Sequence, residues 1–132
     1  MKKLRIYLDT SVVLAHLLAE DRSPPEFIWR QPLVASRLLE YELWTRINAR
    51  GLARSHGQAA RVVIGRLALI ELAPLVLARA LEPFPVPVRT LDAIHLASLE
   101  FVRSRGQTVE LASYDERMLV AARALRIPLC SC

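Results

Sequence analysis

Three of the four aspartates in this chain lie at or beside the start of an expected helix. Asp9 ends the first apolar run, Asp92 falls in the first turn of a later helix, and Asp115 follows another apolar run. Carboxylates gathered in one place repel one another and raise each other's pKa unless a cation lies between them. Oxygen ligands without organised histidines or thiols favour Mg²⁺ and Mn²⁺. Together, these acids predict a divalent metal site suited to phosphodiester chemistry.

The elements that must position these acids follow an alternating pattern. Short apolar runs alternate with longer stretches of helical periodicity, which indicates a parallel sheet covered by helices in a single α/β domain over residues 1–132. The expected strands are 4–9, 33–36, 67–73, 108–114 and 127–132, and the expected helices are 11–20, 37–50, 74–82 and 115–125, with a further helix that begins near Thr90. The proline-rich segments 23–32 and 82–88 are expected to be connections rather than domain linkers.

The functional crevice of an open α/β sheet lies beyond the carboxyl ends of its strands, where these aspartates are expected. Glu40 and Glu42 lie a little further into a helix, and either could point back to the same edge. Each of these polar residues could also have a purely structural role. For any single acid, that role is favoured over metal binding. These roles are N-caps at Ser11, Thr90 and Ser113, a capping box over 113–116 and an ion pair between Glu42 and Arg46.

Four segments resemble the successive motifs of PIN-domain ribonucleases, and of VapC-type toxins in particular. They are YLDTSVVL, SRLLEYELWTRI, RTLDAIHLASL and ELASYDERMLVAARAL. The resemblance implies a Rossmann-like, three-layer α/β/α sandwich with a mostly parallel central sheet. It also implies a metal-dependent endoribonuclease that cleaves RNA, forms a homodimer and is held inactive by a cognate VapB-type antitoxin.

The resemblance assigns roles to the acids by position. Asp9 and Asp92 would be the principal ligands of Mg²⁺ or Mn²⁺. Glu42 would be a further acid that binds metal or orients water, and Asp115 would be the fourth, acting through water or a second metal. Glu40 competes with Glu42 for one family position, and the usual spacing, with the acid directly before Leu43, favours Glu42.

The resemblance also implies roles for the neighbours of these acids. Ser11 and Ser113 match positions that hold the acids by hydrogen bonds. Thr90 would cap its helix, and His95 would pack beside the site without a catalytic role.

Composition and charge limit the alternatives. The longest apolar runs are interrupted by Arg66, Glu71, Pro74 and Arg79, well short of the ~20 residues that a membrane span needs. Asp9 interrupts the stretch that imitates a signal peptide, so a cytoplasmic protein is expected. The net charge is +5, and all but two of the 18 cations are arginines. Arginine suits phosphate recognition, although a GC-rich genome would give the same bias.

Three further expectations concern exposed or terminal residues. Arg46, Arg50 and Arg54 are expected to contact RNA phosphates or an antitoxin. Phe27, Ile28 and Trp29 are expected to be exposed at an interface, with closure of the domain's own core as the alternative. Cys130 and Cys132 can neither frame a disulfide-rich domain nor form a four-ligand zinc site by themselves, so they are expected to be thiols.

Other classes of protein with acids at a sheet edge lack support in this chain. A haloacid-dehalogenase-type phosphatase needs an aspartate where Ser11 stands, and a response-regulator receiver needs a strand-end lysine, whereas Lys2 and Lys3 are the only lysines. The four glycines form no phosphate-binding motif. The remaining alternatives are a PIN-like module that binds RNA or protein without cutting and, less favoured, a DNA nuclease.

Overall fold

The computed structural model describes residues 4–131, and its sheet is parallel throughout. The strands are β1 (Leu4–Leu8), β2 (Leu33–Ser36), β3 (Leu67–Ile70) and β4 (Thr108–Ala112), in the spatial order β3-β2-β1-β4. Strand β1 pairs with β2 on one side and with β4 on the other, and its Tyr7 lies opposite Val34 of β2 and Leu111 of β4. The predicted parallel sheet is therefore confirmed.

The helices are α1 (Thr10–Leu17), α2 (Leu38–Ala49), α3 (Ala53–Gly65), α4 (Pro74–Ala80), α5 (Thr90–Ser104) and α6 (Glu116–Ala124), with a 3-10 helix η1 (Glu26–Arg30). The five expected helices are present, and a further helix that was not among them, α3, follows α2 with no strand between. Within residues 4–131, none of these helices is long and apolar enough to cross a membrane.

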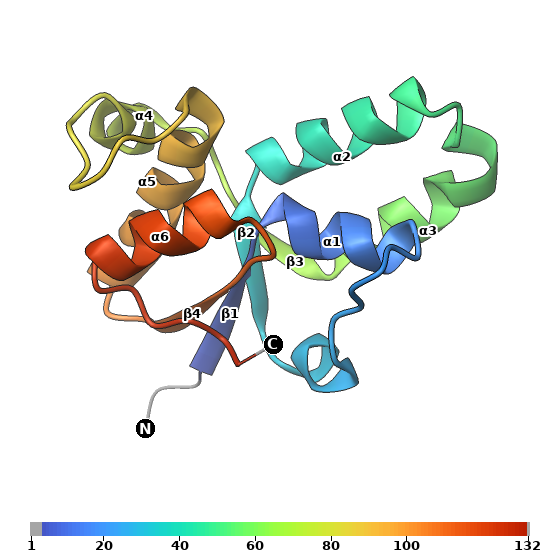
Figure 1. Ribbon diagram of the computed structural model, residues 1–132, viewed down its shortest axis with the longest axis horizontal. Coiled ribbons are helices and arrows are strands. Elements are labelled where there is room, and N and C mark those ends of the chain that lie inside the picture. Colours follow the sequence, from blue (N-terminus) through green and yellow to red (C-terminus); the bar gives the residue numbers. More distant parts are fainter. Residues whose placement is uncertain (1–3, 132) are drawn as a thin grey trace.

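Two apolar cores lie on opposite faces of the sheet, as Figure 1 shows with α1, α2 and α3 on one side of the strands and α4, α5 and α6 on the other. Successive side chains of a strand point to opposite faces. Ile6 and Leu8 accordingly pack in the first core with residues of α1, α2 and α3, whereas Tyr7 packs in the second core with residues of α5 and α6. The chain thus has the predicted three-layer α/β/α architecture.

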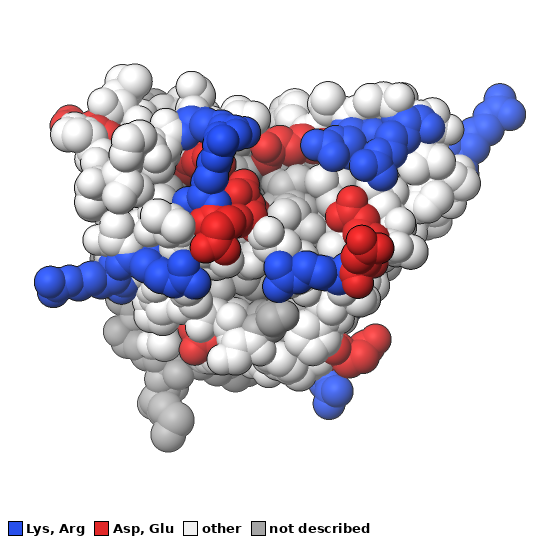
Figure 2. Space-filling view, viewed as in Figure 1, with Lys and Arg blue, Asp and Glu red and all other residues white. Residues whose placement is uncertain are grey.

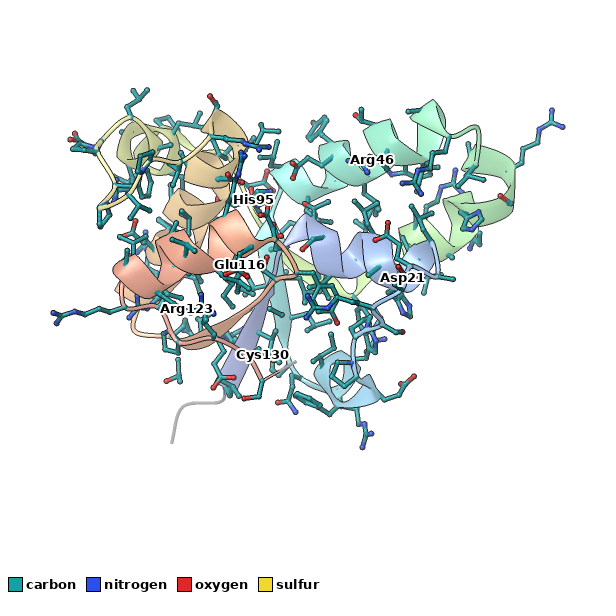
Figure 3. The ribbon with its side chains drawn as sticks, viewed as in Figure 1. Asp21, Arg46, His95, Glu116, Arg123 and Cys130 are labelled. Atoms are coloured by element: carbon teal, nitrogen blue, oxygen red, sulfur yellow. The ribbon has the colours of Figure 1, made fainter. Side chains whose placement is uncertain are left out.

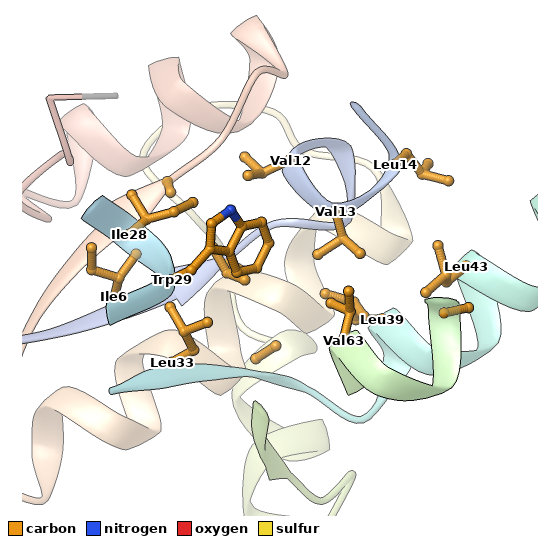
Figure 4. Packing of buried hydrophobic residues seen from close by; sticks show 14 of the residues in the cluster. Ile6, Val12, Val13, Leu14, Ile28, Trp29, Leu33, Leu39, Leu43 and Val63 are labelled. Carbon is orange, nitrogen blue, oxygen red and sulfur yellow. The ribbon is translucent and has the colours of Figure 1, made fainter. Parts of the chain in front are cut away.

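The segment that contains η1 closes the first core instead of forming an exposed apolar surface. Ile28 is fully buried and Trp29 is 8% exposed, and both pack in the same cluster as Ile6 and Leu33 (Figure 4). The predicted exposure is therefore wrong for Ile28 and Trp29, because the 3-10 turn folds their side chains inward. Phe27 is the member of this set that remains exposed, at 41%.

The C-terminal run 127–132, expected as a strand, makes one isolated parallel bridge, between Leu129 and Leu111. Cys130 packs against the first core and is disulfide-bonded, so the expectation of a thiol is wrong there. Cys132 lies outside the described residues.

Candidate active site

The sheet register brings the residues that follow β1 and β4 to one place. Leu8 lies opposite Ala112 in the last pair of the ladder, and the Asp9 amide donates to the Ala112 carbonyl at 3.0 Å. Parallel neighbours end at the same edge, so the residues that follow both strands face each other across it. Asp9 and Ser113 therefore lie side by side where α1 begins and β4 ends.

Asp9 is a buried carboxylate held by two serine hydroxyls. It is 5% exposed, and its Oδ2 accepts from Ser11 Oγ at 2.6 Å and from Ser113 Oγ at 2.8 Å. Each serine is itself fixed, because Ser11 Oγ accepts from the Tyr114 amide and Ser113 Oγ accepts from the Asp115 amide. The structure thus places both serines where the sequence resemblance assigned them a supporting role.

Glu42 reaches the same edge from α2. Its Oε1 accepts from Thr10 Oγ1 at 2.7 Å and lies 2.5 Å from His95 Nε2. Glu40 points elsewhere, and its Oε1 accepts from Arg37 Nη1 at 3.1 Å in an i,i+3 ion pair near the surface. Of the two acids that compete for one family position, the structure therefore brings Glu42, and not Glu40, to the site.

Glu42 and His95 form a coupled pair. Burial raises the pKa of Glu42, but the hydrogen bond and the charge of His95 outweigh burial and lower it. Burial lowers the pKa of His95, but the bond and charge of Glu42, with the charges of Asp9 and Asp92, outweigh burial and raise it. Both shifts favour a carboxylate paired with an imidazolium. Among the described residues no ion pair joins Glu42 to Arg46, the alternative that the spacing suggested.

Asp92 and Asp115 occupy the first turn of α5 and the N-cap of α6, respectively. The pKa of Asp92 is raised, first by burial and then by the charge of Asp115, with a further contribution from Asp9. Asp115 Oδ1 accepts from the Arg117 amide at 3.0 Å. The charges of Asp115 and Asp9 therefore both disfavour the ionised form of Asp92.

The helix caps differ from the predicted ones. Asp9, Arg89 and Asp115 occupy the N-cap positions of α1, α5 and α6, where Ser11, Thr90 and Ser113 were expected. Of these three caps, Asp115 is the one whose side chain accepts a hydrogen bond from its helix. The two serines are thereby free to donate to Asp9.

Basic side chains flank the acids. Figure 2 shows acidic side chains gathered where the starts of α5 and α6 face α2, with basic side chains on either side. Arg89 and Arg117, both exposed, line a hollow of about 370 Å³ together with Pro87, Val88 and Asp92. In Figure 3, His95 lies where α2 faces α5 and α6, Arg46 lies farther along α2, and Asp21 lies away from the site in a loop, as predicted.

The donor set has the chemistry of a site for a hard divalent cation, because its available ligands are carboxylate oxygens. Burial, followed by the charges of Asp115 and Asp9, raises the pKa of Asp92, and a bound cation would favour its ionised form. As the side chains lie, no three His, Cys, Asp or Glu residues within 4–131 converge closely enough to hold one metal ion together. The acids therefore share an electrostatic environment without forming a complete coordination shell.

Comparison with known proteins places this geometry in a family. Residues 6–124 match the PIN domain, so the chain belongs to the PIN domain family. Ribonuclease VapC46 of Mycobacterium tuberculosis is 33% identical over 123 residues, which cover 91% of this chain and 92% of that protein. Ribonuclease VapC35 of the same species is 33% identical over 128 residues, which cover 92% and 93% of the two chains. The resemblance to VapC-type PIN domains is thereby confirmed.

Proposed function

We propose that this chain is an endoribonuclease dependent on Mg²⁺ or Mn²⁺ and the toxin of a toxin–antitoxin pair. One observation carries the proposal: Asp9, Asp92 and Asp115 lie at the starts of three helices, and the charges of Asp9 and Asp115 both act on Asp92. Membership of the PIN domain family and the ribonuclease names of two relatives support the RNA substrate.

Each acid has a distinct part in the proposed reaction. Asp9 and Asp92 are the principal ligands of the cation, which when bound supplies an activated water and neutralises phosphate oxygens. Glu42 binds the cation or orients the water, and Asp115 acts as the fourth acid. Ser11 and Ser113 keep Asp9 in place by donating to its Oδ2.

Exposed arginines supply the proposed RNA-binding surface. Arg89 and Arg117 border the hollow beside Asp92, where a phosphate would lie close to the acids. Arg46, Arg50 and Arg54 are all exposed along α2 and the start of α3. A guanidinium group suits bidentate contact with phosphate oxygens, and a surface of this kind also suits an acidic partner segment.

The partners and setting follow from the same resemblance. We propose that residues 1–132 form one PIN domain in the cytoplasm, that the protein is a homodimer, and that a VapB-type antitoxin covers the active site. Exposed apolar side chains outside η1, among them Leu75, Leu81 and Leu91, offer contact area for such partners.

An RNA cleavage assay tests the function. Purified protein is incubated with RNA and with DNA of the same sequence, in Mn²⁺ and in excess chelator. Cleavage of RNA alone, and only with the metal, is expected. Metal-independent cleavage would contradict the proposed mechanism, cleavage of DNA alone would indicate a DNA nuclease, and binding without cleavage would indicate a non-catalytic PIN-like module.

A further inference from the structure

His95 lies one turn after Asp92 on α5 and is the most buried histidine of the described chain, at 2% exposure. His16 is exposed and His56 is partly exposed. The Tyr7 hydroxyl donates to the His95 carbonyl at 2.9 Å, which fixes the backbone at this position. The imidazole is therefore held in one place inside the protein and does not line the surface where substrate would lie.

Burial of the His95 imidazole destabilises the folded protein, and apolar packing alone gives no reason for a histidine at this position. Within residues 4–131, His95 Nδ1 is buried and has no hydrogen-bond partner. An unpaired buried polar atom destabilises the folded protein, and an aliphatic side chain would fill the same space without that penalty. The remaining ring nitrogen, Nε2, contacts Glu42 Oε1 at 2.5 Å. The polar contact that distinguishes histidine from leucine here is the one to Glu42.

Both donors to Glu42 bind the same oxygen. Thr10 and His95 contact Oε1, and among the described residues no hydrogen bond reaches Oε2. Asp9 repeats this arrangement, because Ser11 and Ser113 both donate to Oδ2 and none of the described hydrogen bonds reaches Oδ1. In each acid one oxygen is anchored twice and the other is left for a ligand.

We propose that His95 is a positioning residue that, together with Thr10, anchors Glu42 by Oε1 and so presents Oε2 to the cation. This inference rests on the proposed function, because it assumes that Glu42 serves the metal. His95 acts through Glu42 and does not itself contact substrate. Helix α5 then has two tasks one turn apart, since it carries one acid, Asp92, and orients another, Glu42, that belongs to α2.

The test measures Mn²⁺ affinity by titration calorimetry, with single-turnover RNA cleavage as the second measurement. His95→Leu removes the donor, and His95→Gln keeps an N–H group near the position of Nε2. Loss of a partner that orients a metal ligand costs about 10- to 100-fold in metal affinity or activity. We expect a loss in that range for His95→Leu and recovery of most of it for His95→Gln. His56→Gln, on α3 and hydrogen-bonded to Ser55, is the control and should bind Mn²⁺ as the unaltered chain does.

A double-mutant cycle separates positioning from a general effect on the fold. In the Glu42→Gln background, His95→Leu should cause no further loss of affinity, because its effect passes through the Glu42 carboxylate. Thr10→Val removes the other donor to Oε1 and should also weaken Mn²⁺ binding. This variant keeps the inference testable if His95→Leu does not fold. Circular dichroism confirms the folded state of each variant.

The outcomes distinguish this inference from the proposed function. Equal Mn²⁺ affinity in folded His95→Leu and the unaltered chain, or an equal further loss in the Glu42→Gln background, would overturn the role of His95 alone. Unimpaired binding by Thr10→Val would equally overturn the double anchor. If the unaltered chain binds no Mn²⁺, the proposed function fails and the inference fails with it.

Discussion

The two sides of the site hold their acids by different means. On the side of α1 and α2, Asp9 and Glu42 each accept two bonds from side-chain donors, on one oxygen of the carboxylate. On the side of α5 and α6, Asp92 and Asp115 lie at helix starts, and Asp115 accepts from a backbone amide. The first pair has donors from other elements, with Ser113 bound to Asp9 and both Thr10 and His95 bound to Glu42, whereas the second lies within the first turns of its own helices.

This difference separates orientation from charge. Hydroxyl and imidazole donors fix where the carboxylates of Asp9 and Glu42 point. Asp92 instead experiences burial and the charges of Asp115 and Asp9, which raise its pKa. We infer that one side of the site supplies prearranged ligands and the other supplies the repulsion that makes cation binding favourable.

Neutralising one principal ligand from each side should give the largest effect. We expect Asp9→Asn and Asp92→Asn to lose more activity than the ~100-fold that loss of a supporting partner causes, because the amide keeps the size but not the charge. The two variants should also differ in thermal stability. Asp92→Asn should unfold at a higher temperature than the unaltered chain because it relieves repulsion, while Asp9→Asn should not. Single-turnover cleavage and thermal unfolding check both statements. Full activity in either variant would exclude the metal mechanism.

Glu40 and Glu42 lie on the same helix, α2, but their neutralisation should affect cleavage differently. Glu42→Gln should nearly abolish cleavage because Glu42 lies at the site, whereas Glu40→Gln should keep most of it. Glu40 forms an ion pair with Arg37, in which each side chain is about one-third exposed, and such pairs contribute less than ~1 kcal/mol. Single-turnover cleavage at saturating Mn²⁺ measures both variants. If Glu40→Gln is the inactive one, the acid at this family position has been assigned to the wrong residue.

The arginines outside the acidic centre should affect binding more than chemistry. RNA affinity of the inactive Asp92→Asn variant should fall steeply as salt rises. Arg46→Ala, Arg50→Ala and Arg54→Ala should each flatten the log–log slope by about one unit or less, because each removes one phosphate contact. Fluorescence anisotropy over a salt series gives the slopes. An affinity independent of salt would show that these side chains are merely solvated.

The smallest expected effect is a shift in the pKa of Asp92. Burial is the largest cause of the raised value and would persist, but Asp115→Asn removes the next cause and should lower the pKa toward its ordinary value. Carboxyl carbon resonances of the metal-free protein, followed against pH, measure the change. An unmoved pKa would show that the two aspartates do not interact.

The raised pKa of Asp92 also makes the stability of the folded protein depend on pH. A carboxyl whose pKa is higher in the folded state than in the unfolded state opposes folding once it ionises. Stability contributed by Asp92 is therefore greatest at low pH and declines as the pH rises from its unfolded pKa through its folded one. Denaturant unfolding of the metal-free protein should show a shallower decline in Asp115→Asn than in the unaltered chain.

Local signals in the sequence were enough to predict the four strands of the sheet and the helix starts at which three acids lie, but they also predicted a fifth strand, 127–132, where the chain makes one isolated bridge. Asp9 and Asp115 follow apolar runs that end at the same edge of a parallel sheet, and Asp92 lies in the first turn of a helix. The contact between Glu42 and His95 could not be predicted in this way, because 53 residues separate them and no periodicity links α2 to α5. The burial of Ile28 and Trp29 was missed for a similar reason, since it depends on how a short 3-10 helix folds back onto distant strands.

Three consecutive residues at the start of α1 connect separate parts of the site. Asp9 accepts from Ser113, Thr10 donates to Glu42, and Ser11 accepts from the amide of Tyr114. If the first turn of α1 opened, all three connections would be lost together, so local unfolding of a few residues would disable the site while both apolar cores stayed closed. We therefore expect the residues at this edge to open as one unit, and exchange of the Tyr114 amide hydrogen with solvent would report how often they do so.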